Sequence, residues 1–186
     1  IVNEPYYKDK NIRITFSDER DELLETGGGI LHASSLLTCN NPEHKFLVHN
    51  VDILSNLRLE ELWAHSSESS DAVLVVSKRK TARYLIFDDD MKLVGWTNIQ
   101  TGEVKSPFNE VHETIAKLHS NELDIEKYHL RAFAGIHYIK TKLIDSMYSW
   151  PTKFSIIDFY LKNCDSHEIK GYTLEDLKLI DGGKIH

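Results

Sequence analysis

Glu25-Thr26-Gly27-Gly28-Gly29 precedes an apolar run, Phe46-Leu47-Val48-His49-Asn50, which ends at Val51-Asp52. Each glycine in a helix costs about 1 kcal/mol relative to alanine. Three glycines at the predicted start of a helix therefore favour a binding use over a flexible turn, because their bare N–H groups can bind an anion or read the edge of a base. In open α/β sheets, ligands gather at the carboxyl ends of strands, which is where Asp52 is predicted to lie.

The segment Ala72–Val76 is almost continuously apolar, which is typical of a strand covered on both faces. The other predicted strands are Asn11–Ser17, a hairpin of Tyr84–Phe87 with Lys92–Trp96, Phe133–Ile139, Ile169–Tyr172 and Leu177–Ile180. The predicted helices open at the glycines and cover Leu57–His65 with Asn56 as N-cap, Leu143–Tyr148, and Ser155–Leu161. Strands that alternate with helices predict an α/β sandwich with a mixed, mainly parallel sheet.

A length of 186 residues predicts one domain spanning residues 1–186, with residues 106–127 as a surface insertion. A net charge of -7 argues against a nucleic-acid partner, because phosphate backbones require a basic face. Cys39 and Cys164 form no metal or redox motif and are expected to be free thiols in a reducing cytosol. No signal peptide or membrane-length apolar run is visible, so we expect a cytoplasmic protein with no membrane partner.

Near the end of the chain, Leu179-Ile180-Asp181-Gly182-Gly183 offers a second carboxylate at the end of a predicted strand. Helix capping by Asp52 and turn formation by Asp181-Gly182 are the structural alternatives. Taken together, Asp52 and Asp181 are predicted to hold Mg²⁺, which binds few carboxylates, several waters and the phosphate oxygens of its substrate.

The run Asp88-Asp89-Asp90 could act as the Asp-x-Asp metal motif of nucleotide-sugar glycosyltransferases. Its two flanks are matched apolar runs, which favour a solvated hairpin turn. The ten histidines form no His-Glu-x-x-His pattern, and there is no Gly-x-Ser-x-Gly elbow.

The chain resembles the sugar-phosphate nucleotidyltransferase family, most closely the bacterial branch of mannose-1-phosphate guanylyltransferases and N-acetylmuramate-1-phosphate uridylyltransferases. The matching segments occur in family order over nearly the whole chain and are 17–20, 24–30, 47–54, 83–88, 133–137, 154–160 and 180–183.

This resemblance implies a Rossmann-like core that couples a nucleoside triphosphate (NTP) to a sugar 1-phosphate, releasing pyrophosphate. It implies that Asp52 and Asp181 are the catalytic residues and hold Mg²⁺. The nucleotide-binding residues that it implies are Glu25, Thr26, Gly27, Gly28 and Asn50, and the sugar-binding residues are Trp96, Asn98, Gly135 and Asp158. A homo-oligomer is compatible with it.

One feature of the family is missing from this sequence. Such enzymes begin with a strand and a Gly-x-Gly-Thr-Arg loop, followed by a lysine, that grip the triphosphate. Ile1-Val2-Asn3 resembles the third strand of the family instead. We therefore expect an enzyme that lacks its first strands and binds nucleotide weakly by itself. A non-catalytic sugar-nucleotide sensor and a glycosyltransferase are the alternative functions.

Overall fold

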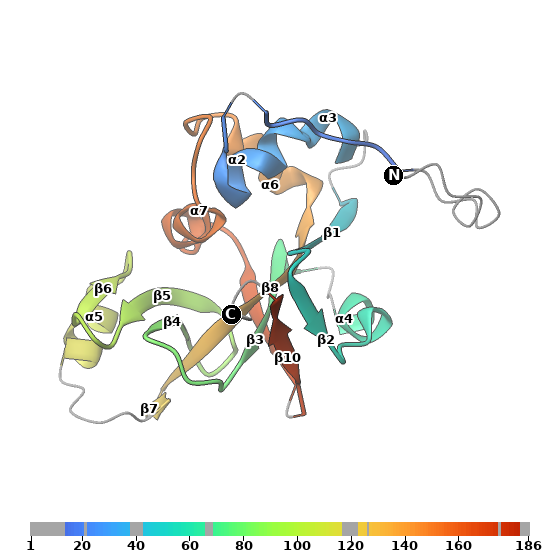
Figure 1. Ribbon diagram of the computed structural model, residues 1–186. Helices are drawn as coiled ribbons and strands as arrows, with labels where there is room; N and C mark the ends of the chain where they lie inside the picture. Colours follow the sequence, from blue (N-terminus) through green and yellow to red (C-terminus); the bar gives the residue numbers. More distant parts are fainter. Residues whose placement is uncertain are drawn as a thin grey trace.

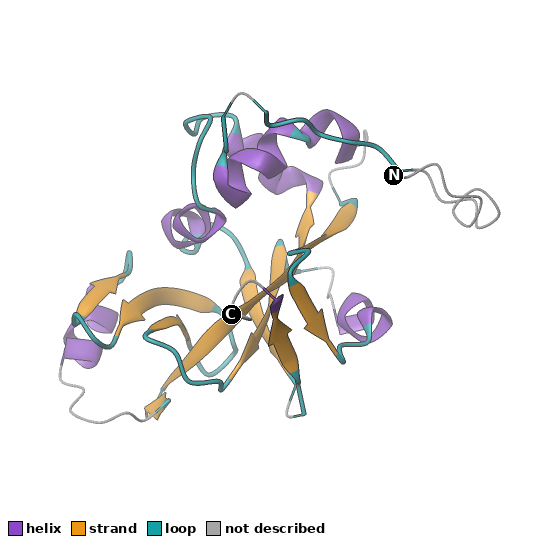
Figure 2. Cartoon of the chain, viewed as in Figure 1, coloured by secondary structure: helices purple, strands orange, loops and turns teal. Residues whose placement is uncertain are grey.

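The structure, a computed structural model, describes residues 14–20, 22–37, 43–65, 69–116, 123–125, 127–174 and 176–182. In this part of the chain, helices pack on both sides of a bent sheet (Figure 1). The strands form the centre of the molecule and the helices lie around it (Figure 2).

The main sheet has the strand order β6-β5-β4-β8-β3-β9, and β1 and β7 also pair with β8. Its strands are β1 (Lys45–His49), β3 (Ala72–Ser77), β4 (Arg83–Phe87), β5 (Leu93–Asn98), β6 (Glu103–Lys105), β7 (Asp124–Ile125), β8 (Tyr128–Lys140) and β9 (Ile169–Thr173). A second, two-stranded sheet contains β2 (Ile53–Ser55) and β10 (Leu179–Asp181).

The α/β class and the mixed sheet are confirmed, but the described strands pair mainly in antiparallel fashion. The parallel pair is β3 with β9. The difference from the expected parallel sheet has two causes: β8 runs antiparallel to β1, β3 and β4, and β4, β5 and β6 form successive hairpins.

Strand β3 is buried along its whole length, as its apolar sequence predicts. Ala72, Leu74 and Val76 pack into one hydrophobic cluster. Val73 and Val75 belong to another, on the opposite face. This alternation follows from the two-residue period of a strand.

The helices divide between these faces. Helices α2 (Glu25–His32), α3 (Ser34–Leu37), α6 (Thr141–Met147) and α7 (Ile156–Asn163) contribute to the cluster that contains Leu74. Helix α4 (Leu59–His65) buries Leu62 in the cluster on the opposite face, which contains Val73. Helix α5 (Asn109–Ala116) buries Val111 and Ile115 in a third cluster, which also contains Ile86 of β4 and Val94 of β5.

Two local predictions are wrong. Asn56 does not cap α4: its side chain donates to the carbonyl of Asp176 at 2.9 Å and accepts from the N–H of Lys178 at 2.8 Å. The segment Ile14–Ser17 forms no strand, and Phe16 is 71% exposed. The predicted strand at Ile1–Asn3 lies outside the described residues, as does Cys39. In the part of the chain that is described, no helix has the length and apolar character to cross a membrane.

Candidate functional site

A cavity of about 690 Å³ lies beside α7. The register of strands β4, β5 and β6 determines which side chains form its floor. Arg83 on β4 is paired with Asn98 on β5, which is paired with Glu103 on β6. The neighbouring row contains Leu85, Trp96 and Lys105. Cross-strand partners and residues two apart point to the same face of a sheet, so these six side chains share one face. We call this space the α7 cavity.

Helix α7 forms one wall of the α7 cavity. The hydroxyl of Ser155 accepts from the N–H of Ile157 at 3.2 Å and caps the helix. Ser155, Ile157 and Asp158 then line the cavity. Asp158 faces Lys105, whose Nζ lies 3.4 Å from its Oδ1.

The cavity combines an aromatic side chain with polar groups. Trp96 is partly exposed, and Lys105 Nζ lies 5.2 Å from the centre of one of its rings. Three of the predicted sugar-binding residues, Trp96, Asn98 and Asp158, therefore line one cavity. The arrangement can present a flat apolar face and several hydrogen-bonding groups to a polar ligand.

Gly135, the fourth predicted sugar-binding residue, contacts the predicted nucleotide-binding residue Asn50. The N–H of Asn50 donates to the carbonyl of Gly135 at 3.0 Å. Gly135 has φ = 73°, and a Cβ at this position would lie 2.8 Å from Asn50 Nδ2. Glycine is needed here for both reasons.

Strand β8 connects the α7 cavity to this Asn50–Gly135 contact. Phe133 lines the cavity and precedes Gly135 by two residues, a rise of about 7 Å along the strand. The loop that follows Asn50 contains Asp52, whose side chain is exposed.

The segments that contain Asp52 and Asp181 lie side by side. In the small sheet, Asp181 on β10 is in register with Ile53 on β2. The N–H of Gly182 donates to the carbonyl of Asp52 at 2.7 Å. The side chain of Asp181 lies outside the described part of the structure. Among the described residues, no group of three His, Cys, Asp or Glu side chains is placed to hold a metal ion.

The residue types at these two positions are ones that Mg²⁺ accepts. Asp52 has an exposed carboxylate, and Asp181 follows Ile180 at the end of the adjacent strand. Mg²⁺ is commonly bound by one or two carboxylates, with waters and substrate phosphates as the remaining ligands. Mg²⁺ binding by Asp52 and Asp181 stays a prediction.

The triple glycine has a packing role. The N–H groups of Gly27 and Gly28 donate to the carbonyl of Phe154 at 3.0 and 3.2 Å. A Cβ on Gly28 would lie 2.2 Å from the carbonyl oxygen of Thr152. The glycines thus hold α2 against the segment that leads into α7.

Glu25 and Thr26 are exposed at the start of α2. Glu25 has φ = 61°, a left-handed conformation that non-glycine residues adopt rarely. Because Phe154 occupies the N–H groups of Gly27 and Gly28, nucleotide contact at these two glycines would have to use other atoms. Nucleotide binding by residues 25–28 stays a prediction.

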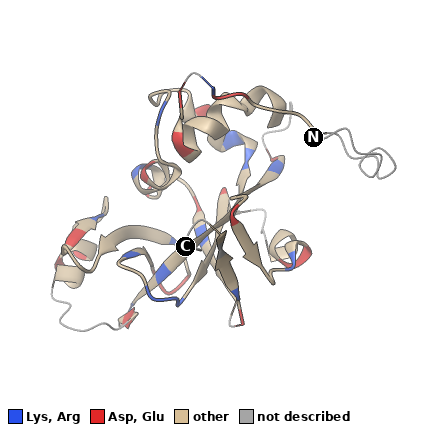
Figure 3. Ribbon diagram, viewed as in Figure 1, with Lys and Arg blue, Asp and Glu red and all other residues tan. Residues whose placement is uncertain are grey.

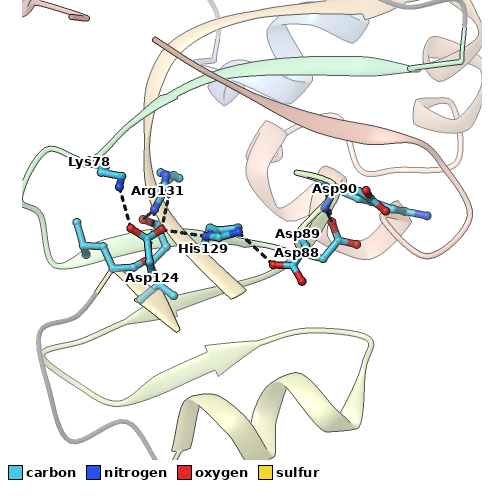
Figure 4. A network of polar contacts seen from close by, with 10 residues as sticks. Lys78, Asp88, Asp89, Asp90, Asp124, His129 and Arg131 are labelled. Atoms are coloured by element: carbon cyan, nitrogen blue, oxygen red, sulfur yellow. Dashed lines mark hydrogen bonds and ion pairs between the residues drawn. The ribbon is translucent and has the colours of Figure 1, made fainter. Parts of the chain in front are cut away.

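The Asp88–Asp90 run forms a turn. Asp88 Oδ1 accepts from the N–H groups of Asp90 and Lys92 at 3.0 and 2.8 Å. Asp89 Oδ1 lies 3.3 Å from His129 Nε2, as Figure 4 shows. The Asp88 carboxylate therefore stabilises the hairpin turn, in the way that aspartate side chains commonly do.

His129 joins this turn to a network around Asp124 (Figure 4). Asp124 accepts from Lys78 and His129 at 2.8 and 2.9 Å and pairs with the buried Arg131. Partial burial opposes ionisation of Asp124, but these hydrogen bonds outweigh it and hold its pKa far below the usual value. The network anchors the start of β8.

A buried pair supports the region between β8 and α7. His137 on β8 and Tyr160 on α7 are hydrogen-bonded at 2.6 Å. Burial lowers the pKa of His137 to about 3, and it raises that of Tyr160 well above its ordinary value. Both side chains are therefore neutral at pH 7, which suits a structural role.

The sequence interpretation missed the basic residues of the α7 cavity. Arg79, Arg83 and Lys105 line it together with Glu103 and Asp158. Elsewhere, residues of both charges are interspersed over the described elements (Figure 3). The basic run Lys78-Arg79-Lys80 directly after the buried strand was the available signal in this acidic chain.

No protein-family model matches the sequence, and no curated protein matches it. Solved structures do match the fold. HddC from Yersinia pseudotuberculosis complexed with GMP-PN has a TM-score of 0.57 at 20% identity, over 89% of this chain and 60% of that chain. The inositol-1-phosphate CTP transferase from T. maritima has a TM-score of 0.56 at 14% identity, over 85% and 56%.

The UDP-glucose pyrophosphorylase from Acinetobacter baumanii has a TM-score of 0.59 at 15% identity, over 88% of this chain and 53% of that chain. The chain thus spans between 53% and 60% of the length of these three structures. At these identities the likeness shows the fold alone: the chain has the α/β fold of these three structures.

Proposed function

We propose that the chain is the nucleotidyltransferase core of an enzyme that couples an NTP to a sugar 1-phosphate, giving an NDP-sugar and pyrophosphate. The observation that carries this proposal is the pairing of β2 with β10, because it brings the ends of two distant segments, Asp52 and Asp181, together. The fold supports the general kind of reaction, since two of the matching structures are by name a CTP transferase and a pyrophosphorylase.

The proposed reaction is an in-line displacement at the α-phosphorus of the NTP. A phosphate oxygen of the sugar 1-phosphate forms the new P–O bond, and the bond to the β-phosphate breaks, so pyrophosphate leaves with the bonding electron pair. The attacking oxygen is already anionic, so no general base is required, and positioning with charge neutralisation supplies the catalysis. A bound Mg²⁺ would neutralise charge on the phosphoryl oxygens.

The residues of this chain would divide the work. The α7 cavity would hold the sugar against Trp96, with Asn98 and Asp158 as hydrogen-bonding partners. Gly135 lets Asn50 approach β8 closely, where the sugar and the nucleotide would meet. Asp52 and Asp181 would hold the metal, which would neutralise negative charge on the phosphates.

The test is pyrophosphate release from a grid of NTPs and sugar 1-phosphates, measured with the full gene product. We expect release with at least one pair, a loss of roughly 100-fold or more in Asp52→Asn, and wild-type rates in the matched control Asp145→Asn. Asp145 is exposed on α6, away from β2 and β10. Equal rates in Asp52→Asn and Asp145→Asn would contradict the role of Asp52.

The glycosyltransferase alternative makes the opposite prediction for metal binding. It places the metal at Asp88–Asp90, where the Asp88 carboxylate is engaged by backbone N–H groups. Under our proposal, Asp88→Asn leaves Mn²⁺ affinity unchanged while Asp52→Asn abolishes it. The reverse pattern would favour a glycosyltransferase.

A further inference from the structure

Basic side chains outnumber acidic ones in the lining of the α7 cavity. Three cations and two carboxylates line it, in a chain whose net charge is -7. Lys105 is balanced by both carboxylates: its Nζ lies 3.4 Å from Asp158 Oδ1 and 4.0 Å from Glu103 Oε1. The charged lining therefore has one net positive charge, and Arg79 and Arg83 are the cations that neither carboxylate contacts.

Arg79 and Arg83 retain most of their hydrogen-bonding capacity. Arg79 donates from Nη2 to the carbonyl of Phe133 at 3.1 Å, which uses one of the five N–H donors of a guanidinium. Arg83 projects from β4 on the cavity face, opposite Asn98, and no acidic side chain among the described residues pairs with it.

Arg79 and Arg83 lie beside the residues that are predicted to bind the sugar rather than the nucleotide base. Both line the same cavity as Trp96, Asn98 and Asp158. Arg79 also contacts Phe133, the residue two before Gly135, so it lies on the side of the cavity that leads along β8 towards Asn50 and Asp52.

We propose that Arg79 and Arg83 bind the phosphate of the sugar 1-phosphate and thereby select phosphorylated over free sugars. This inference rests on the proposed function for the identity of the ligand. Guanidinium groups match the oxygens of a phosphate in a two-pronged geometry. A phosphate monoester has roughly two negative charges at pH 7, which two arginines neutralise. With its phosphate fixed at Arg79, the ligand directs one oxygen along β8 towards the nucleotide.

Direct binding in the absence of NTP tests this proposal independently of turnover. The probes are glucose 1-phosphate, mannose 1-phosphate, the two free hexoses, and inorganic phosphate, each titrated into the full chain by calorimetry. We expect the wild-type chain to bind a hexose 1-phosphate at least 10-fold more tightly than the free hexose. Arg79→Gln and Arg83→Gln should each weaken binding of the 1-phosphate by about 10- to 100-fold and leave binding of the free hexose unchanged.

Arg58→Gln is the matched control. Arg58 is exposed just before α4, pairs with Glu61 within that helix, and does not line the cavity. Arg79→Lys distinguishes charge from geometry, and we expect it to recover only part of the affinity. Arg83→Gln keeps the test valid if loss of the Phe133 contact unfolds Arg79→Gln, because Arg83 is exposed.

Equal wild-type affinity for a hexose and its 1-phosphate overturns the proposal, as does full retention of the phosphate preference in both glutamine variants. Absence of binding by every phosphate-bearing probe also overturns it. If arginine-dependent phosphate binding occurs without pyrophosphate release in the transfer assay, the proposed function fails and the anion site stands.

Discussion

Replacing adjacent glycines of α2 tests whether the triple glycine serves packing. In Gly28→Ala, the new Cβ would lie 2.2 Å from the Thr152 carbonyl oxygen and 2.9 Å from Leu24 Cβ. The first of these contacts is with backbone, so α2 must move away. Overpacking of this kind costs about 1–3 kcal/mol, and loss of the hydrogen bond from Gly28 to Phe154 adds about 1 kcal/mol.

Alanine's higher helix propensity returns about 1 kcal/mol of this cost. We therefore expect Gly28→Ala to lower the free energy of unfolding by about 1–3 kcal/mol. In Gly29→Ala the nearest atom is Glu19 Oε1 at 2.7 Å, the end of a flexible side chain that can move. That variant should range from unchanged to about 1 kcal/mol more stable.

Urea unfolding followed by circular dichroism measures both variants under the same conditions. The difference between them is the informative quantity, because both make the same chemical change one residue apart. Equal stability of Gly28→Ala and Gly29→Ala would refute the packing explanation. Ligand binding would then be the remaining explanation for the three glycines.

Two further predictions concern pH. Because the pKa of His137 is lowered to about 3 in the folded state, the unfolded chain binds the extra proton below about pH 6.5. The free energy of unfolding should then fall by up to about 5 kcal/mol between pH 6.5 and 3. In His137→Gln, the urea midpoint should lack this part of the pH dependence. If the variant and the wild type lose stability equally as the pH falls, His137 is excluded as the cause. Asp124→Asn leaves the buried Arg131 without its carboxylate and should cost about 2 kcal/mol at pH 7, less than a fully buried pair because Asp124 is 45% exposed. Because the pKa of Asp124 is lowered in the folded state, the stability difference between wild type and Asp124→Asn should stay constant from pH 7 to 5 and shrink below about pH 4. Thermal melts across this pH range measure it. Equal stability of the two proteins at pH 7 would contradict a stabilising Asp124–Arg131 pair.

The local elements could be predicted from the sequence where the hydrophobic pattern is strong. The run Ala72–Val76 is long enough in apolar residues to specify a strand buried on both faces, and the turn at Asp88–Asp90 follows from its two apolar flanks. Strand direction could not be predicted in this way. The same apolar pattern fits a parallel or an antiparallel neighbour, so the central position of β8 had to come from the structure.

The candidate site could likewise be predicted from the sequence only in part. The cost of three glycines favours a binding use, but in the structure the N–H groups of Gly27 and Gly28 contact Phe154, far along the chain, and short-range patterns do not identify such a contact. Trp96, Asn98 and Asp158 came from the family resemblance and line one cavity. Arg79 and Arg83 were visible as charges, but only strand register places Arg83 beside Asn98.

The most direct test of the account is whether Asp52 and Asp181 share one divalent ion. Mn²⁺ binding in the presence of a nucleotide, followed by electron paramagnetic resonance, would be compared for the wild-type chain, Asp52→Asn, Asp181→Asn and the double variant. Ligands of one ion are strongly coupled, so we predict that the double variant loses little more affinity than either single variant. Losses that add independently, or single variants that bind Mn²⁺ as the wild type does, would contradict a shared metal site.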